Sequence, residues 1–273
     1  MTRPLVLITG ASAGIGAALA REFAAHGWDL ALTARRQDRL ADLAEEMKAK
    51  NGVDSIVIAA DMHQKSAPAA ILKAIAEAGR HVDGLINNAG YGLPGTYLHP
   101  QWKSHAAFLQ IMLMAPCELV YRTLPGMQSR GFGRIINVAS LAGHLPGSMG
   151  HTLYAADKAF LIKFSQSLNL ENTTTGVHVS ALCPGFTFSE FHDVNNTRAL
   201  VSKLPGWMWK TAEDVAAIGY RAVEKNVAVR VPGFANKTIA ALAKLMPEPL
   251  ALALMRAQTR NFRVADEDAG KAE

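Results

Sequence analysis

The chain has 273 residues, of which 49% are hydrophobic and 19% are charged, so it can bury one large core. The formal net charge of +5 comes from scattered basic residues with no arginine-rich run, which argues against a nucleic-acid partner. The two cysteines, Cys117 and Cys183, lack metal-ligand and redox-motif spacing. We therefore expect no metal site and a reducing compartment.

The N-terminal residues already predict structure, because a strand-like run begins at Leu5. This leaves no room for a signal peptide. No apolar stretch reaches the length that a membrane-spanning helix needs. We expect a cytoplasmic protein.

Short apolar runs alternate with longer segments of helical periodicity. The predicted strands are 5–9, 29–33, 55–60, 84–87, 134–138, 178–183 and 227–231. The predicted helices are 16–25, 38–51, 67–78, 102–129, 153–173 and 212–224. Nearly continuous apolar strands are typical of a parallel sheet with helices on both faces. The pattern predicts an α/β fold with a doubly wound, Rossmann-like parallel sheet of about seven strands, which binds ligands at the carboxyl ends of its strands.

A glycine-rich turn follows the first predicted strand and opens a helix. It has the spacing G-x-x-x-G-x-G and contains Gly10, Ser12, Gly14, Ile15 and Gly16. Glycines let the backbone approach a ligand closely, and the N-terminus of a helix attracts a pyrophosphate. A loose glycine turn is the alternative, but the strand before it and the helix after it favour dinucleotide binding.

The end of the second predicted strand bears on which dinucleotide is bound. An acidic residue there would accept hydrogen bonds from the adenosine ribose, and this chain has Arg35 and Arg36 instead. Two guanidinium groups suit a 2′-phosphate, to which Ser12 adds a hydroxyl. The cofactor is therefore predicted to be NADP(H), with Arg35 as the stronger candidate. A solvated basic loop and a preference for NAD(H) are the alternatives.

Tyr154 and Lys158 lie four residues apart, a spacing that places them on one face of a helix. Two unit charges roughly 4 Å apart interact by about 4 kcal/mol at an effective dielectric of about 20. We therefore expect Lys158 to lower the pKa of Tyr154 towards neutrality, which would make the phenol an acid–base group. Ser140 precedes this pair, at the end of an apolar run.

Together these features resemble one family, the short-chain dehydrogenase/reductases. The motifs that occur in its order and approximate spacing are Thr9-Gly10-x-x-x-Gly14-Ile15-Gly16, Asn87-Asn88-Ala89-Gly90, Ser140, Tyr154-x-x-x-Lys158 and Pro184-Gly185. The resemblance covers about residues 4 to 232, and the tail resembles a poorly characterised bacterial branch with a helical C-terminus. It implies an oxidoreductase that transfers a hydride between NADP(H) and a carbonyl or alcohol and forms a homodimer or homotetramer.

The resemblance also implies roles for single residues. Tyr154 would be the general acid or base, Lys158 would also hydrogen-bond the nicotinamide ribose, and Ser140 would hold the substrate oxygen. A strand-end serine that caps a turn is the alternative for Ser140. Further residues would contact the adenine, the ribose and the nicotinamide. These are Asp61, Met62, Asn88, Ala89, Gly90, Pro184, Gly185 and Thr187.

One position departs from the family's pattern. The family's fourth catalytic residue is an asparagine, and Met112 occupies that position. In the family, the main-chain carbonyl of this asparagine holds a relay water. Pro116 has no N–H, so it would kink the helix and leave the carbonyl of Met112 without its usual partner. We expect a working enzyme that uses only this backbone carbonyl; the alternative is a catalytically impaired NADP(H)-binding regulatory or interaction protein.

The substrate is expected to be an apolar ketone, aldehyde or alcohol, bound between 91–97, 143–151 and a lid at 186–210. The predicted substrate contacts are Ser140, Leu145, Met149, Phe186 and Trp207. We assign 1–232 to a dinucleotide-binding catalytic domain that includes the lid, and 233–273 to a helical extension of it. The amphipathic segments 239–246 and 249–262 are expected to pack on the domain or a subunit partner, with peripheral membrane contact as the alternative.

Overall fold

The fold is a parallel sheet between two layers of helices. The computed structural model describes residues 2–93, 95–150, 152–188, 206 and 209–257. Seven strands pair in parallel in the order β3-β2-β1-β4-β5-β6-β9. Their bounds are β1 Leu5–Thr9, β2 Asp29–Ala34, β3 Ser55–Ala59, β4 Gly84–Asn87, β5 Gly133–Val138, β6 Val177–Leu182 and β9 Val229–Arg230. The predicted doubly wound α/β fold is confirmed, and the strand order reverses between β1 and β4.

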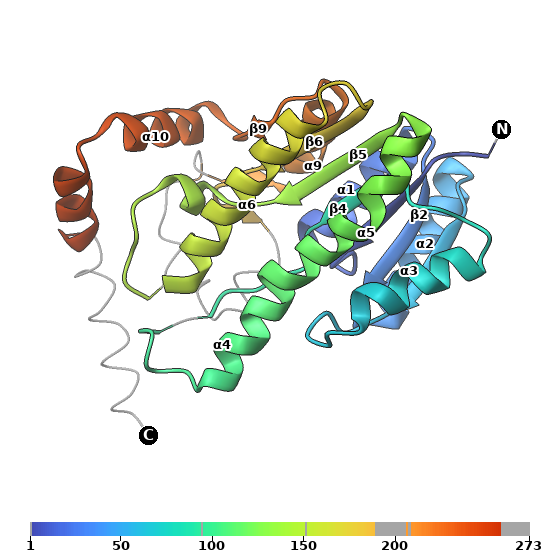
Figure 1. The fold of residues 1–273 in the computed structure, drawn as a ribbon, viewed down its shortest axis with the longest axis horizontal. Helices are drawn as coiled ribbons and strands as arrows, with labels where there is room; N and C mark the ends of the chain where they lie inside the picture. The colour runs from blue at the N-terminus through green and yellow to red at the C-terminus, as the bar shows by residue number, and fades with distance from the viewer. Residues whose placement is uncertain (1, 94, 151, 189–205, 207–208, 258–273) are drawn as a thin grey trace.

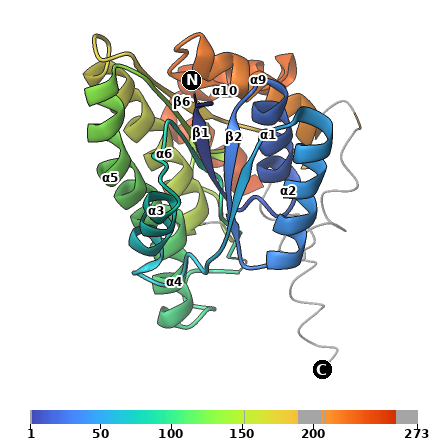
Figure 2. The same cartoon turned by 90° about the vertical axis from the view of Figure 1, so that its right-hand side faces the viewer.

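Helices cover both faces of this sheet. Figure 2 shows α1, α2 and α9 on one side of it and α3, α5 and α6 on the other. The helix bounds are α1 Gly14–Ala25, α2 Gln37–Asn51, α3 Ala67–Glu77, α4 Trp102–Leu109, α5 Ala115–Arg130, α6 Thr152–Glu171, α9 Ala212–Glu224 and α10 Phe234–Leu245. Each layer buries its own apolar cluster against the sheet.

The alternation of side chains along β1 explains why its sequence is apolar throughout. Val6 and Ile8 pack in the cluster under α1, α2 and α9, whereas Leu5 and Leu7 pack in the cluster under α3 and α5. All four side chains are fully buried. Successive residues of a strand point to opposite faces, so a strand covered on both faces has no polar side.

The long helix predicted at 102–129 is three segments rather than one. Between α4 and α5 lies a π-helical turn, Gln110–Met114, in which the N–H of Ala115 donates to the carbonyl of Gln110. Pro116 follows in the first turn of α5. Proline has no N–H to donate four residues back, so the regular hydrogen-bond pattern cannot pass through it. π-helical turns of this kind are frequent at functional sites.

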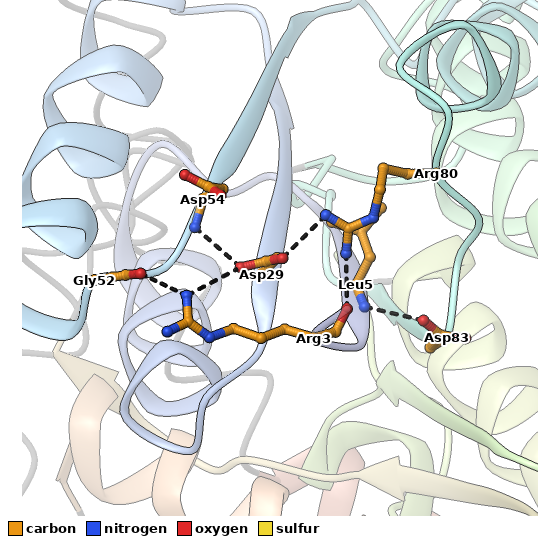
Figure 3. A network of polar contacts seen from close by, with 7 residues as sticks. All are labelled: Arg3, Leu5, Asp29, Gly52, Asp54, Arg80 and Asp83. Carbon is orange, nitrogen blue, oxygen red and sulfur yellow. Dashed lines mark hydrogen bonds and ion pairs between the residues drawn. The ribbon is translucent and has the colours of Figure 1, made fainter. Parts of the chain in front are cut away.

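The amino end of the sheet is held by a polar network (Figure 3). Asp29 opens β2 and accepts a hydrogen bond of 3.0 Å from Arg80 Nη1, and Arg3 Nη1 lies 3.8 Å from its other oxygen. Asp83 accepts the N–H of Leu5 at 3.1 Å. This network lies at the edge opposite to the carboxyl ends of the strands, so we assign it to stability alone.

The C-terminal part continues past β9 as α10 and a second helix at 248–257 (Figure 1). The predicted lid is bounded by two short strands, β7 Thr187–Phe188 and β8 Lys210–Thr211, which pair in parallel. Most of the lid, including Trp207, lies outside the described residues, as do residues 258–273. In the described part of the chain, no helix is long and apolar enough to cross a membrane.

Candidate active site

The glycine-rich turn joins β1 to α1 at the carboxyl edge of the sheet. Gly10 and Gly14 have φ angles of +67° and +54°, which favour glycine. A Cβ on Gly16 would lie 2.3 Å from the carbonyl oxygen of Gly10, so the turn is too tight for a side chain there. The residue before α1 is Ala13, whose methyl side chain cannot cap the helix, and the first turn of α1 has no acidic residue. Ile15 packs against the core. The N–H groups at the start of α1 thus lack a side-chain cap, and such groups can bind a pyrophosphate.

Asn88 holds this turn in place. Its side-chain amide donates to the carbonyl oxygens of Thr9, at 2.9 Å, and Gly10, at 3.2 Å. The backbone N–H groups of Asn88 and Ala89 both donate to the hydroxyl of Thr9, at 2.9 and 3.0 Å. The sequence Asn88-Ala89 therefore fixes the ends of β1 and β4 against each other, beside the point where the strand order reverses.

Two arginines follow β2, next to the glycine turn. Arg36 donates to the hydroxyl of Ser12 through Nε, at 3.3 Å, and through Nη2, at 3.1 Å. Arg35 is exposed. Two guanidinium groups and a hydroxyl at the end of β2 could therefore hold a phosphate group.

Asp61 belongs to a cluster that the sequence did not predict. His63 donates its N–H to the Asp61 carboxylate at 3.1 Å, and its Nδ1 lies 2.8 Å from the same oxygen. The other ring nitrogen, Nε2, is 3.4 Å from the hydroxyl of Tyr91. Burial raises the pKa of Asp61, but the hydrogen bonds from His63 and the charge of Arg35 outweigh it and lower the pKa. An Asp two residues before a His is a side-chain-to-backbone turn pattern and is the signal that identifies this cluster.

Met62, also predicted to lie beside the adenine, is buried in the core cluster under α3. Its contact with the adenine stays a prediction.

Ser140 lies just beyond β5 and has two partners. It begins the 3₁₀ turn Leu141–His144, and its hydroxyl accepts the N–H of Ala142 at 3.1 Å. A hydrogen bond from Ser140 also lowers the pKa of the Tyr154 phenol. Ser140 therefore both caps the 3₁₀ turn and lies within hydrogen-bonding distance of Tyr154.

The pKa of Tyr154 differs from the expectation. Burial raises it to about 12; the hydrogen bond from Ser140 lowers it, and the charge of Asp157 adds to the increase. The ammonium of Lys158 lies 5.6 Å from the centre of the Tyr154 ring and donates to the carbonyl of Val138 at 3.0 Å. The expectation that Lys158 brings this pKa towards neutrality is therefore wrong for this structure, because burial dominates and the ammonium is directed to Val138.

Lys158 is buried, and a carboxylate stands beside it. Its Nζ lies 3.6 Å from Oδ2 of Asp157, a residue that the sequence analysis did not single out. Burial lowers the pKa of Lys158, and the charge of Asp157 opposes that decrease. The backbone of Lys158 is packed tightly as well, since a Cβ on Gly143 would lie 2.6 Å from its carbonyl carbon.

Met112 fills space beside the end of β4. Its side chain is 2% exposed, and a Cβ on Gly90 would lie 2.6 Å from its sulfur. The side chain therefore packs as a core methionine against Gly90 and brings no hydrogen-bonding amide. Participation of its backbone carbonyl stays a prediction.

The loop after β6 closes the site from the other side. The N–H of Leu141 donates to the carbonyl of Pro184 at 2.8 Å, and the buried Thr187 donates its hydroxyl to the carbonyl of Gly185 at 3.2 Å. A Cβ on Gly185 would lie 2.5 Å from the amide nitrogen of Asn236 on α10. The buried Asn236, which the sequence analysis missed, thus packs the C-terminal extension directly onto this loop.

A groove of ≈ 330 Å³ opens beside the start of α6. Figure 1 shows the C-terminal helix next to the loop that leads into α6, and the two segments together line the groove. Its lining residues are Gly147, Ser148, Met149, Thr152, Leu252, Met255 and Arg256. Of the predicted substrate contacts, Met149 lies here, whereas Leu145 is not part of the lining.

Phe186, another predicted substrate contact, packs against Trp209, with ring centroids 5.6 Å apart. Trp209 in turn stacks on Phe188 at 4.7 Å. In the part of the chain that the structure describes, no group of three His, Cys, Asp or Glu residues could hold a metal ion.

Comparison with known proteins agrees with this geometry. A model of the short chain dehydrogenase family matches residues 4–199. The ketoacyl reductase HetN of Nostoc sp. strain PCC 7120 is 34% identical over 246 residues, which are 90% of this chain and 84% of HetN. A short-chain dehydrogenase from Sphingobium yanoikuyae, solved in complex with NADPH, is 32% identical with a TM-score of 0.77, over 85% of this chain and 88% of that one.

A bulky-bulky ketone specific alcohol dehydrogenase from Comamonas testosteroni is 30% identical with a TM-score of 0.74, over 91% of this chain and 95% of that one. The family model matches more than half of the chain, and these relatives span most of it. The protein therefore belongs to the short-chain dehydrogenase family.

Proposed function

We propose that the protein is an NADP(H)-dependent oxidoreductase that interconverts an apolar ketone or aldehyde and its alcohol. The observation that carries this proposal is the contact between Ser140 and Tyr154 at the carboxyl edge of the sheet, with the ammonium of Lys158 on the same helix. A protein that only binds a dinucleotide has no need for an acid at this place.

The cofactor would supply or accept the hydride when bound. The open N-terminus of α1 fits its pyrophosphate, and Arg35, Arg36 and Ser12 fit a 2′-phosphate. The NADPH complex of the Sphingobium yanoikuyae relative supports this choice. Pro184, Gly185 and Thr187 would hold the nicotinamide end, and the sequence Asn88-Ala89-Gly90 would line the ribose.

In the direction of reduction, negative charge develops on the carbonyl oxygen and must receive a proton. Ser140 would hold that oxygen, and Tyr154 would donate its phenolic proton to it. Because its pKa is about 12, Tyr154 carries this proton at neutral pH. Lys158 would then stabilise the phenolate that remains, and the backbone carbonyl of Met112 would hold the water that returns the proton.

The groove beside α6 supports an apolar substrate. Met149, Leu252 and Met255 offer apolar surface, with Arg256 at the same groove. The relative from Comamonas testosteroni acts on bulky-bulky ketones. We propose a ketone with a large apolar substituent, bound between the catalytic domain at 1–232 and the extension at 233–273.

The assembly that we propose is a homodimer or homotetramer. α5 and α6 expose large apolar side chains: Tyr121 is 80% exposed, and Phe160, which stacks on Phe164, is 37% exposed. Exposed apolar residues of this size are typical of interaction surfaces. We place the interface on the outer side of these two helices.

Consumption of NADPH against a panel of carbonyls tests the proposed function. The panel contains acetophenone, cyclohexanone and decanal, and the matched control is Tyr154→Phe, which removes a single hydroxyl. We expect turnover by the unchanged protein and a decrease in kcat of about 10²–10⁴-fold in Tyr154→Phe, because general acid catalysis contributes that much. Binding of NADPH should be retained in the variant.

The rival function is a cofactor-binding regulatory or interaction protein, and the observation that favours it is the apolar side chain of Met112 at the position of the family's asparagine. Tight binding of NADPH by a well-folded protein that turns over none of the carbonyls would establish this rival instead.

A further inference from the structure

Asp157 is a buried acid that the proposed mechanism does not use. Its side chain is 1% exposed, and neither of its carboxylate oxygens has a hydrogen-bond partner in the part of the chain that the structure describes. Burying a carboxylate without hydrogen bonds is unfavourable unless a charge compensates it. The group that compensates it here is Lys158, whose Nζ lies 3.6 Å from Oδ2.

The titratable groups around Asp157 come from two elements. On α6 itself they are Lys158 and Tyr154, and across from it on α5 is Cys117. Beyond β6, Cys183 interacts with Lys158 rather than with Asp157. Burial raises the pKa of Asp157 to about 6, and the nearby charge of Lys158 partly opposes this increase. Asp157 and Lys158 therefore form a pair.

The negative charge of Asp157 acts on both members of the acid–base pair in the same sense. It raises the pKa of Lys158 against the effect of burial, and it raises the pKa of Tyr154 in addition to the effect of burial. A negative charge favours the protonated form of each neighbour.

We propose that Asp157 is a positioning residue of this active site, which keeps Lys158 protonated and, through its own negative charge, holds Tyr154 as a phenol that is ready to donate its proton. This inference rests on the proposed function, because it explains why Tyr154, the proposed general acid, keeps its proton. It also explains why Asp157 lies between Tyr154 and Lys158, because a buried carboxylate does not improve the packing of the core.

The test is the pH dependence of alcohol oxidation, in which Tyr154 must lose its proton to act as the base. The probe is 1-phenylethanol with NADP⁺, and kcat/KM is measured across the pH range. In Asp157→Asn, which keeps the shape and removes the charge, we expect the rise of kcat/KM to move to lower pH by about one unit. Asp157→Glu should restore most of the profile of the unchanged protein.

The control is Glu171→Gln, which removes the same charge from the exposed end of the same helix and should leave the profile in place. A purely structural role predicts a different result, namely that Asp157→Asn lowers kcat/KM equally at every pH without moving the profile. That result, or a shift to higher pH, would overturn the proposal.

A second measurement does not need turnover and so separates this proposal from the proposed function. The ¹³C resonance of the Asp157 carboxyl, assigned by its loss in Asp157→Asn, is followed against pH in the intact protein. We expect a midpoint near pH 6 and an increase of at least about one unit in Lys158→Met, because the compensating charge is gone. An unchanged midpoint in Lys158→Met would refute the charge pair even if the protein proved to have no reductase activity.

Discussion

At the scale of single residues, the carboxyl of Asp157 makes the stability of the fold depend on pH. Burial raises its pKa from 3.8 to about 6, so the folded state binds this proton more tightly than the unfolded state. The stabilisation from this group is fully present below about pH 4 and is lost as the pH rises through about 6. Asp157→Asn removes the effect.

We therefore expect the free energy of unfolding of Asp157→Asn, relative to that of the unchanged protein, to increase by about 3 kcal/mol between acid and alkaline pH. Urea denaturation at several pH values measures this, with Glu171→Gln as the control for the loss of one charge. A stability difference that is the same at every pH would show that the carboxyl of Asp157 titrates normally.

Arg35 is the residue on which the choice of cofactor depends. It is exposed at the end of β2, beside the contact between Arg36 and Ser12. A hydrogen bond to a charged group contributes about 1.5–3 kcal/mol, so Arg35→Ala should weaken NADPH binding about ten- to a hundredfold and leave NADH binding unchanged. Titration of both cofactors by fluorescence measures the two affinities. Lys48→Ala, at the far end of α2, is the matched control, and equal affinities for NADPH before and after Arg35→Ala would contradict the NADP(H) assignment.

For Tyr154, the sequence predicted its position on a helix but not its pKa. The spacing of Tyr154 and Lys158 predicted their shared helix, and the structure has both on α6. The direction of the pKa shift of Tyr154 was not predictable, because it depends on burial and on where the ammonium of Lys158 points. Both are set by contacts with distant segments. Asp157 was overlooked for the same reason, since its burial depends on how α6 packs against segments distant in the sequence.

At the scale of elements, the turn between β1 and α1 is the part most sensitive to a small change. A Cβ on Gly16 would lie 2.3 Å from the carbonyl oxygen of Gly10, which is backbone and cannot swing away. We expect Gly16→Ala to destabilise the protein by about 1–3 kcal/mol and to abolish most of its NADPH affinity. Thermal denaturation and cofactor titration measure these effects.

The control for that change is Gly147→Ala, because nothing lies within 4 Å of a Cβ at Gly147 and its φ is not positive. Cofactor binding should be unchanged in this control. If Gly16→Ala behaved like it, the turn would not be the tight cradle that the backbone contacts describe.

Most elements were predictable because their hydrophobic patterns are strong. The six helices and seven strands expected from the sequence are found within a few residues of their predicted bounds, apart from the segment at 102–129. The sequence predicts one helix at 102–129 because residues with helical propensity and periodicity occur throughout it. The π-helical turn at Gln110–Met114 is a property of backbone hydrogen bonds near Pro116, which residue periodicity does not register.

At the scale of the whole molecule, the strand order brings the site together. The glycine turn follows β1, Asn88 follows β4, Ser140 follows β5 and Pro184 follows β6, so all four lie at the carboxyl edge of neighbouring strands. This is the edge at which doubly wound folds bind their ligands. The polar network around Asp29 lies at the opposite edge, so the residues that we assign to stability are distant from the candidate active site.

Contacts between segments distant in the chain could not be predicted from the sequence. The packing of Asn236 against Gly185 and the contact of His63 with Tyr91 join residues that no local pattern relates. The groove beside α6 depends likewise on where the helix at 248–257 is placed. These contacts determine how the substrate and the cofactor are enclosed, whereas the sequence motifs determine which chemistry is available.

The central claim is that Tyr154 donates a proton to a carbonyl that NADPH reduces. The most direct test is the rate of NADPH consumption with acetophenone as substrate, measured for the unchanged protein and for Tyr154→Phe at the same cofactor occupancy. We predict measurable turnover that falls by about 10²–10⁴-fold in the variant. Equal rates in the two proteins, or NADPH binding without turnover in both, would contradict the claim.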